Sequence, residues 1–244
     1  MRFSFLIILS LVFISGIDFK SAQLKYSRVK ESYEEKEENF KKLYEAKSLD
    51  YKKQTILIRV FKNEKELELW VKNSKSAYTL LKIYPICKAS GTLGPKRKTG
   101  DYQVPEGFYH VDRFNPQSAF YLSLGLNYPN ASDKILSDKQ NPGGDIFIHG
   151  NCVSIGCMAM TDDQIKELYI AAVEARNGGQ NRIPVHIYPF RMTDSNMAKV
   201  NKLFEDKKTL LSFWENLKTG YDLFEKNNQW SSVSVDNKGK YLFN

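Results

Sequence analysis

Cysteine and histidine are scarce in this chain, with three of each among 244 residues. The cysteines Cys87, Cys152 and Cys157 are too few for a fold that depends on a disulfide framework. Three is also an odd number, so at least one cysteine has no intramolecular disulfide partner. In an exported chain such a leftover thiol can be reactive.

Other features are missing as well. After the N-terminal region, no stretch is long and apolar enough to span a bilayer, and we find no internal repeat, low-complexity linker or nucleic-acid motif. The formal net charge of +8 is spread along the chain, so the charge does not indicate a nucleic-acid partner. A hydrophobic content of 42% is that of a globular protein with a substantial core.

The N-terminus has the pattern of a targeting segment. Arg2 precedes an apolar run from Phe3 to Ile17, which is shorter than a typical membrane span. This pattern predicts a secretory signal with cleavage after Gly16 or after Ala22, and an uncleaved membrane anchor is the alternative. No cysteine lies nearby to carry a lipid. We therefore expect a periplasmic protein that contacts the membrane only if this segment is retained.

The remaining sequence predicts one α+β domain, mainly β, with helices at both ends. Strands are expected at 55–61, 66–71, 78–86, 108–111, 146–149 and 184–188, and a long loop at 113–145. Helices are expected over 24–48, from the Thr161–Gln164 capping box to Gly178, and over 194–227. The expected division is a signal or anchor (1–22), a helical leader (23–50), a central domain (51–192) and a helical extension packed on that domain (193–244).

The most informative segment runs from Ile148 to Met160, because it places a histidine and two cysteines within nine positions. A thiol becomes a good nucleophile when a base removes its proton, and the oxyanion formed by its attack needs hydrogen-bond donors. Cys157 is the candidate nucleophile and His149 the candidate base. The N–H groups of Gly156 and Cys157 are candidate oxyanion donors, and Ser154 is expected to orient His149 or to bind substrate.

Two other interpretations of this segment remain open. The residues can form a structural cluster, or His149, Cys152 and Cys157 can bind a metal ion if a further ligand such as His110 or His186 joins them. Cys152 can pack in the core or form a disulfide with either of the other cysteines. The cluster of basic residues Lys96–Lys98 either lies in a solvated loop or faces an anionic substrate.

The segment resembles the active-site signature of L,D-transpeptidases of the YkuD type, in which a His is followed by a Ser-x-Gly-Cys turn. It is especially similar to the YafK-like branch, where the His and Cys are close together. Stretches 100–109, 115–130 and 186–192 resemble that branch in the same order, and the resemblance spans roughly residues 55–240. Two positions depart from the common pattern, because Ile155 and Ala159 stand where many members carry His and Arg.

The resemblance implies a mixed-sheet, sandwich-like catalytic domain that acts on peptidoglycan stem peptides. Cys157 matches the acylated nucleophile, His149 its partner, and Ser154 a turn residue. The expected oxyanion or substrate-binding residues are Gly150, Gly156 and Arg191; for Arg191 the alternative is a surface charge at a strand end.

The implied reaction is attack on the L-centre carbonyl of diaminopimelate, followed by transfer to an amine or to water. No metal or organic cofactor is implied, and a wall-attached protein is a further possible partner. A non-catalytic wall-binding module, which Ile155 and Ala159 favour, and a metal-bound structural protein are the other function classes.

Overall fold

The structure is a computed structural model, which describes residues 18–73, 77–230 and 232–243. The predicted signal run at 3–17 lies outside these residues. Ten strands are described: β1 Gln54–Phe61, β2 Glu66–Asn73, β3 Thr79–Pro85, β4 Gly107–Asn115, β5 Ser123–Leu126, β6 Phe147–His149, β7 Met158–Ala159, β8 Pro184–Tyr188, β9 Val233–Val235 and β10 Tyr241–Phe243. The described helices are α1 Phe19–Gln23, α2 Ser27–Glu45, α3 Ala131–Leu136, α4 Asp162–Asn177, α5 Asp194–Leu203 and α6 Lys208–Asn227.

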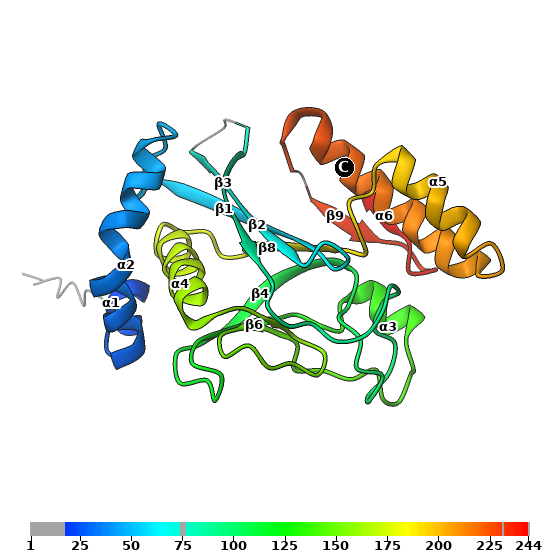
Figure 1. The fold of residues 1–244 in the computed structure, drawn as a ribbon, viewed down its shortest axis with the longest axis horizontal. Helices are drawn as coiled ribbons and strands as arrows, with labels where there is room; N and C mark the ends of the chain where they lie inside the picture. Colours follow the sequence, from blue (N-terminus) through cyan, green and yellow to red (C-terminus); the bar gives the residue numbers. More distant parts are fainter. Residues whose placement is uncertain (1–17, 74–76, 231, 244) are drawn as a thin grey trace, which may run out of the picture.

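One mixed sheet of eight strands, in the order β3-β2-β1-β8-β4-β5-β6-β7, organises the molecule (Figure 1). The helices α1, α2 and α4 lie on one side of this sheet and α5 and α6 on the other. The α+β prediction is confirmed, although helical residues outnumber strand residues. Strands β9 and β10 form a separate two-stranded sheet.

The central strand β1 is apolar almost throughout because helices cover both of its faces. Ile56, Ile58 and Val60 belong to the core on the α4 side, whereas Phe61 packs with Tyr188 and Trp214 on the α6 side. Between them, Arg59 is buried and forms ion pairs with Glu68 and Glu225. This two-sided burial fixes the frame that carries β6 and β7 at one end of the sheet.

Helix α4 begins as the capping box predicts. The Thr161 hydroxyl accepts a hydrogen bond from the Gln164 N–H, and the Gln164 side chain accepts one from the Thr161 N–H. The helix is buried nearly all round because the sheet lies on one side and α1 and α2 lie on the other. The α2 contact is partly polar: the Lys166 ammonium lies 2.8 Å from Glu31 and 2.7 Å from Glu35. The helical leader therefore packs against α4.

Two predicted segments differ from the structure. The expected loop at 113–145 contains β5 and the helix α3, which begins at an Asn130 capping box. The expected helix over 194–227 is two helices, because the chain leaves the helical conformation at Phe204 and re-enters it at Lys208. The two-residue strand β7, which was not predicted, is too short to show an alternating pattern.

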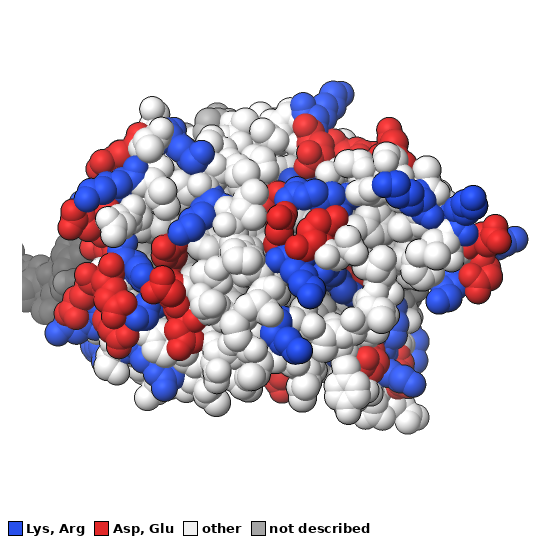
Figure 2. All heavy atoms as spheres, viewed as in Figure 1, with Lys and Arg blue, Asp and Glu red and all other residues white. Residues whose placement is uncertain are grey.

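On the face in Figure 2, basic and acidic side chains are interspersed, above all over α2 at the left. No helix in the described parts of the chain is both long and apolar enough to cross a bilayer.

Candidate active site

Strands β6 and β7 bring His149 and Cys157 to the same face of the sheet. They pair in parallel, with Ile148 opposite Met158 and His149 opposite Ala159. Cys157 directly precedes β7 and is level with Phe147, two residues before His149, so the alternation of a strand directs both side chains the same way. Both line one pocket of about 660 Å³. The structure therefore brings together the two residues that the sequence singled out.

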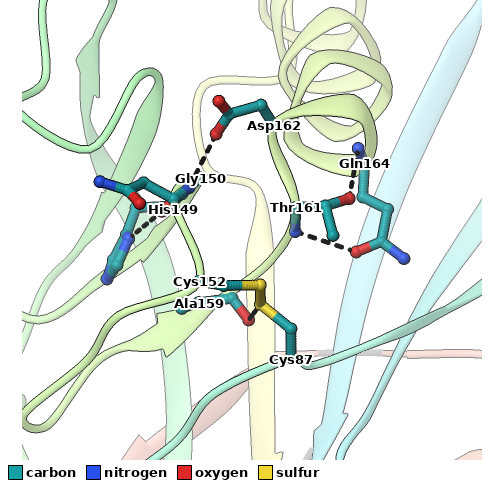
Figure 3. Close-up of a disulfide and its surroundings, with 9 residues drawn as sticks. Cys87, His149, Gly150, Cys152, Ala159, Thr161, Asp162 and Gln164 are labelled. Carbon is teal, nitrogen blue, oxygen red and sulfur yellow. Dashed lines mark hydrogen bonds between the residues drawn. A yellow bond between two sulfur atoms is a disulfide. The ribbon is translucent and has the colours of Figure 1, made fainter.

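His149 is prepared to act as a base. Its side chain is only 2% exposed, and its Nδ1 lies 2.6 Å from the backbone carbonyl of Gly150 (Figure 3). A carbonyl oxygen only accepts, so Nδ1 carries the hydrogen and Nε2 carries the lone pair. Burial lowers the pKa of His149, and the ring of Phe120 lies 4.6 Å away. The imidazole is thus neutral at pH 7, in the tautomer that can accept a proton.

Cys157 is a neutral thiol at rest. Burial raises the pKa of its thiol, Asp145 raises it further, and a backbone hydrogen bond at Phe147 and the charge of Lys96 lower it only in part. The Sγ donates to the Asp145 carbonyl at 3.6 Å, and no hydrogen bond within the described chain joins it to the imidazole. The two groups are thus a neutral pair, and the proton has to move during the attack.

Ser154 builds the turn that carries the thiol. Its hydroxyl accepts a hydrogen bond from the Cys157 N–H at 2.8 Å and donates one to the Cys157 carbonyl at 2.7 Å. This corrects two expectations, because Ser154 contacts Cys157 rather than His149, and the Cys157 N–H is already engaged.

Gly156 supplies the other candidate oxyanion donor. It lines the pocket, and its N–H has no hydrogen-bond partner in the described part of the chain. Its φ of +130° is one that residues with a side chain rarely adopt, so glycine is required here by conformation. The Gly156 N–H is therefore the better candidate for an oxyanion donor.

Gly150 is required for close packing. A Cβ at this position would lie 2.6 Å from Asp162 Oδ1 and 3.0 Å from the Phe120 carbonyl. Gly150 does not line the pocket; its carbonyl orients His149 instead. The same Asp162 oxygen accepts the Asn151 N–H at 2.7 Å, which ties the loop after β6 to the first turn of α4.

A disulfide between Cys87 and Cys152 anchors the other side of this loop (Figure 3). Beside it, the Cys87 N–H donates to the Ala159 carbonyl at 3.0 Å, and Ala159 forms an isolated bridge with Lys88. The segment that carries Cys157 is thus fixed by a covalent bond at one end and by β7 at the other. Cys157 is the free thiol, as the odd number of cysteines predicted.

The disulfide gives a first testable prediction. It closes a loop of 65 residues, for which chain entropy gives about 4 kcal/mol of stabilisation as an upper figure. The Cys87→Ser/Cys152→Ser double variant should melt roughly 5–15 °C below the wild type. A reductant should lower the wild-type Tm but leave the double variant unchanged. Equal melting temperatures, or three titratable thiols in the denatured, unreduced protein, would show that the bond is absent.

The disulfide also removes Cys152 from the set of metal ligands proposed above. Within the described residues, no group of three or more His, Cys, Asp or Glu side chains is placed to bind a metal ion. His186 is buried against Trp230, with ring centroids 4.0 Å apart.

The structure does not bring Arg191 to the pocket. Its guanidinium pairs with Glu66 at 2.6 Å and Glu68 at 2.8 Å and lies over the ring of Phe61. Ala159 is fully buried in β7, and Ile155 is 81% exposed and lines the pocket. The two departures from the family pattern therefore leave the His149–Cys157 arrangement intact.

Several pocket residues were not predicted from the sequence. Phe120, Asp145 and Phe147 line the pocket together with Lys96. Of these residues, only Lys96 had a signal in the sequence, the cluster of basic residues at 96–98. Phe120 and Asp145 come from loops whose path the sequence pattern does not give.

Comparison with known proteins identifies the family of this chain. The L,D-transpeptidase catalytic domain family, YkuD, matches residues 55–187. The Escherichia coli (strain K12) protein named "Putative L,D-transpeptidase YafK" is 44% identical to this chain over 201 residues. The matched region covers 80% of this chain and 78% of the relative. The protein of the same name from E. coli O157:H7 gives the same figures. Among solved structures, the helical cell shape determining protein Pgp2 from Campylobacter jejuni is 18% identical with a TM-score of 0.46, covering 74% of this chain and 73% of the other. With a family match over more than half of its length, the chain belongs to the YkuD family of L,D-transpeptidase catalytic domains.

Proposed function

We propose that this protein is an exported cysteine acyltransferase that acts on peptidoglycan stem peptides at diaminopimelate. Family membership supports a peptidoglycan-related, transpeptidase-type role. The observation that carries the finer proposal is the pairing, on one pocket wall, of a free thiol with a buried neutral imidazole whose Nε2 lone pair is available.

The proposed reaction has two halves. Nε2 of His149 takes the thiol proton as Sγ of Cys157 attacks the L-centre carbonyl, and the Gly156 N–H donates to the developing oxyanion. The bond from that carbonyl to the next residue then breaks, the imidazolium gives its proton to the leaving amine, and a thioester remains. An acceptor amine attacks the thioester to form a new amide, or water attacks to form a carboxylic acid, and the thiol is restored.

Export is part of the proposal. An oxidising compartment suits the Cys87–Cys152 disulfide, and the N-terminal sequence has the pattern of a secretory signal. Of the two predicted cleavage sites, the one after Gly16 leaves α1 intact. Cleavage after Ala22 would remove Phe19, whose ring packs 4.9 Å from that of Phe114.

The test is digestion of purified wall material and of a diaminopimelate tetrapeptide, with products identified by mass. Crosslinked products identify transfer to an amine, and a tripeptide identifies hydrolysis. A wild-type preparation that binds the tetrapeptide and forms neither product would favour the non-catalytic wall-binding module.

The neutral resting pair predicts a particular pH dependence. Alkylation by iodoacetamide needs the thiolate, and burial raises the pKa of Cys157 above its usual 9.0. The rate should therefore climb about tenfold per pH unit between pH 7 and 9. Turnover needs the unprotonated ring because His149 acts as the base. Burial lowers the pKa of His149 below 6.5, so turnover should fall only below that pH. An alkylation rate already level at pH 7 would indicate a preformed thiolate–imidazolium pair instead.

A further inference from the structure

Lys96 is an unusual member of the pocket wall because it is charged and yet only 6% exposed. Its ammonium donates to Asp101 Oδ1 at 2.6 Å and to the Lys98 carbonyl at 2.8 Å. An ammonium has three N–H donors, and these two are its hydrogen bonds within the described chain. One donor is therefore left without a partner in the described chain, on a residue that lines the pocket.

The surrounding loops fix this ammonium in place. The Asp101 carboxylate that contacts it also accepts the N–H groups of Arg97, Lys98 and Gln103, at 2.7, 3.0 and 3.1 Å. On the other side, a Cβ at Gly143 would lie 2.7 Å from Lys96 Cε, so a glycine lets the 141–145 loop close over the lysine. A cation that is already positioned and largely desolvated binds an anion more strongly than a mobile surface lysine does.

The pocket presents charges of both signs beside the thiol. The positive charge of Lys96 lowers the pKa of the Cys157 thiol, and the negative charge of Asp145 raises it. Both residues line the pocket. The Asp145 carboxylate is 83% exposed and pairs with Arg113 at 2.9 Å. Each of these charges has a counter-charge, Asp101 for Lys96 and Arg113 for Asp145, but Lys96 still offers an N–H donor and the Asp145 carboxylate still offers acceptor lone pairs. An entering carboxylate is therefore better placed at Lys96 and an ammonium group at Asp145.

We propose that Lys96 binds the D-centre carboxylate of the diaminopimelate side chain and so selects stem peptides that carry this residue. The inference rests on the proposed function. The D-centre carries a carboxylate and an ammonium on one carbon, which matches the pair of opposite charges in the pocket. The terminal carboxylate of the stem is the other anion of the same chemistry, but it brings no ammonium for Asp145. A stem with lysine in place of diaminopimelate retains the amine and lacks the D-centre carboxylate.

The experiment compares three tetrapeptides: one with diaminopimelate, one with lysine at that position, and one with diaminopimelate and an amidated C-terminus. Binding is measured by calorimetry in the Cys157→Ala background, which cannot be acylated. Lys96→Gln removes the charge and keeps N–H donors for Asp101 and Lys98. Lys98→Met removes the same charge from an exposed neighbour in the same loop that does not line the pocket, and is the matched control.

We expect the Cys157→Ala protein to bind the diaminopimelate peptide about 10- to 100-fold more tightly than the lysine peptide. The preference should fall to within about threefold with Lys96→Gln and persist with Lys98→Met. Amidation of the C-terminus should have little effect.

Three results would overturn the assignment: no preference for diaminopimelate in the parent protein, an undiminished preference with Lys96→Gln, or a comparable loss on C-terminal amidation that depends on Lys96. The first of these needs no folded Lys96 variant. Turnover by the wild type is scored separately, so selective binding without turnover would contradict the proposed catalysis and leave the role of Lys96 supported.

Discussion

Replacing Cys157 with alanine should reduce turnover of a diaminopimelate tetrapeptide by at least about 10³-fold, to the level of the assay background. The sulfur is the acyl carrier in the proposed reaction, and no other free cysteine is present among the described residues. Cys157→Ser should be almost as inactive, because a hydroxyl is a far weaker nucleophile beside the same imidazole.

Stability separates this result from misfolding. Cys157 is partly exposed, and the hydrogen bonds of its side chain, to the Asp145 carbonyl and at the Phe147 backbone, involve a weakly bonding sulfur, so either variant should melt within about 2 °C of the wild type. The matched control is Cys87→Ser/Cys152→Ser, which loses both other sulfurs and should retain measurable turnover. Full activity in Cys157→Ala would remove Cys157 as the nucleophile. Abolition by the control at a temperature where it is folded would show instead that the disulfide is needed to hold the segment that carries Cys157.

Replacing His149 with alanine should lower kcat/KM about 10²- to 10⁴-fold, the usual contribution of a positioned general base. The thiol is neutral at rest, so without the imidazole its proton has no acceptor at the moment of attack. Alkylation at pH 9.5 should change little, because there hydroxide rather than His149 removes the proton. The combination of lost turnover and retained alkylation distinguishes a missing base from a collapsed pocket.

His110→Ala is the matched control for this experiment. His110 is half-buried in β4 and does not line the pocket, so its loss should change kcat/KM less than about threefold. A His149→Ala protein that keeps wild-type turnover would show that another group accepts the proton. Loss of alkylation at pH 9.5 would show instead that His149 maintains the loop structurally.

Much of the fold was predictable because local signals dominate there. Strand β1 is recognisable by its apolar run, and α4 by the capping box at Thr161 and the glycines after its last turn. The break between α5 and α6 has no proline or glycine to mark it, and β5 lies in a loop-like composition. Both depend on tertiary packing, which a single sequence does not display.

The candidate site shows the same division. The pairing of His149 with Cys157 follows from their spacing in one strand–turn–strand segment, and the structure brings them together. The engagement of the Cys157 N–H by Ser154 depends on side-chain geometry within the turn. The position of Lys96 in the pocket wall depends on contacts between distant segments. The ion pairs of Arg191 with Glu66 and Glu68, which keep Arg191 away from the pocket, depend on such contacts too. Residue types and spacing pointed to the candidate pair, and long-range contacts determined which other polar groups reach the pocket.

The most direct measurement is the intact mass of the protein after incubation with a carbapenem, an acylating agent for a nucleophilic cysteine of this family. The account predicts an increase equal to one drug molecule, mapped to the peptide that contains Cys157 and absent from Cys157→Ala. An unmodified wild-type protein that nevertheless converts the tetrapeptide, or an adduct that persists in Cys157→Ala, would contradict it.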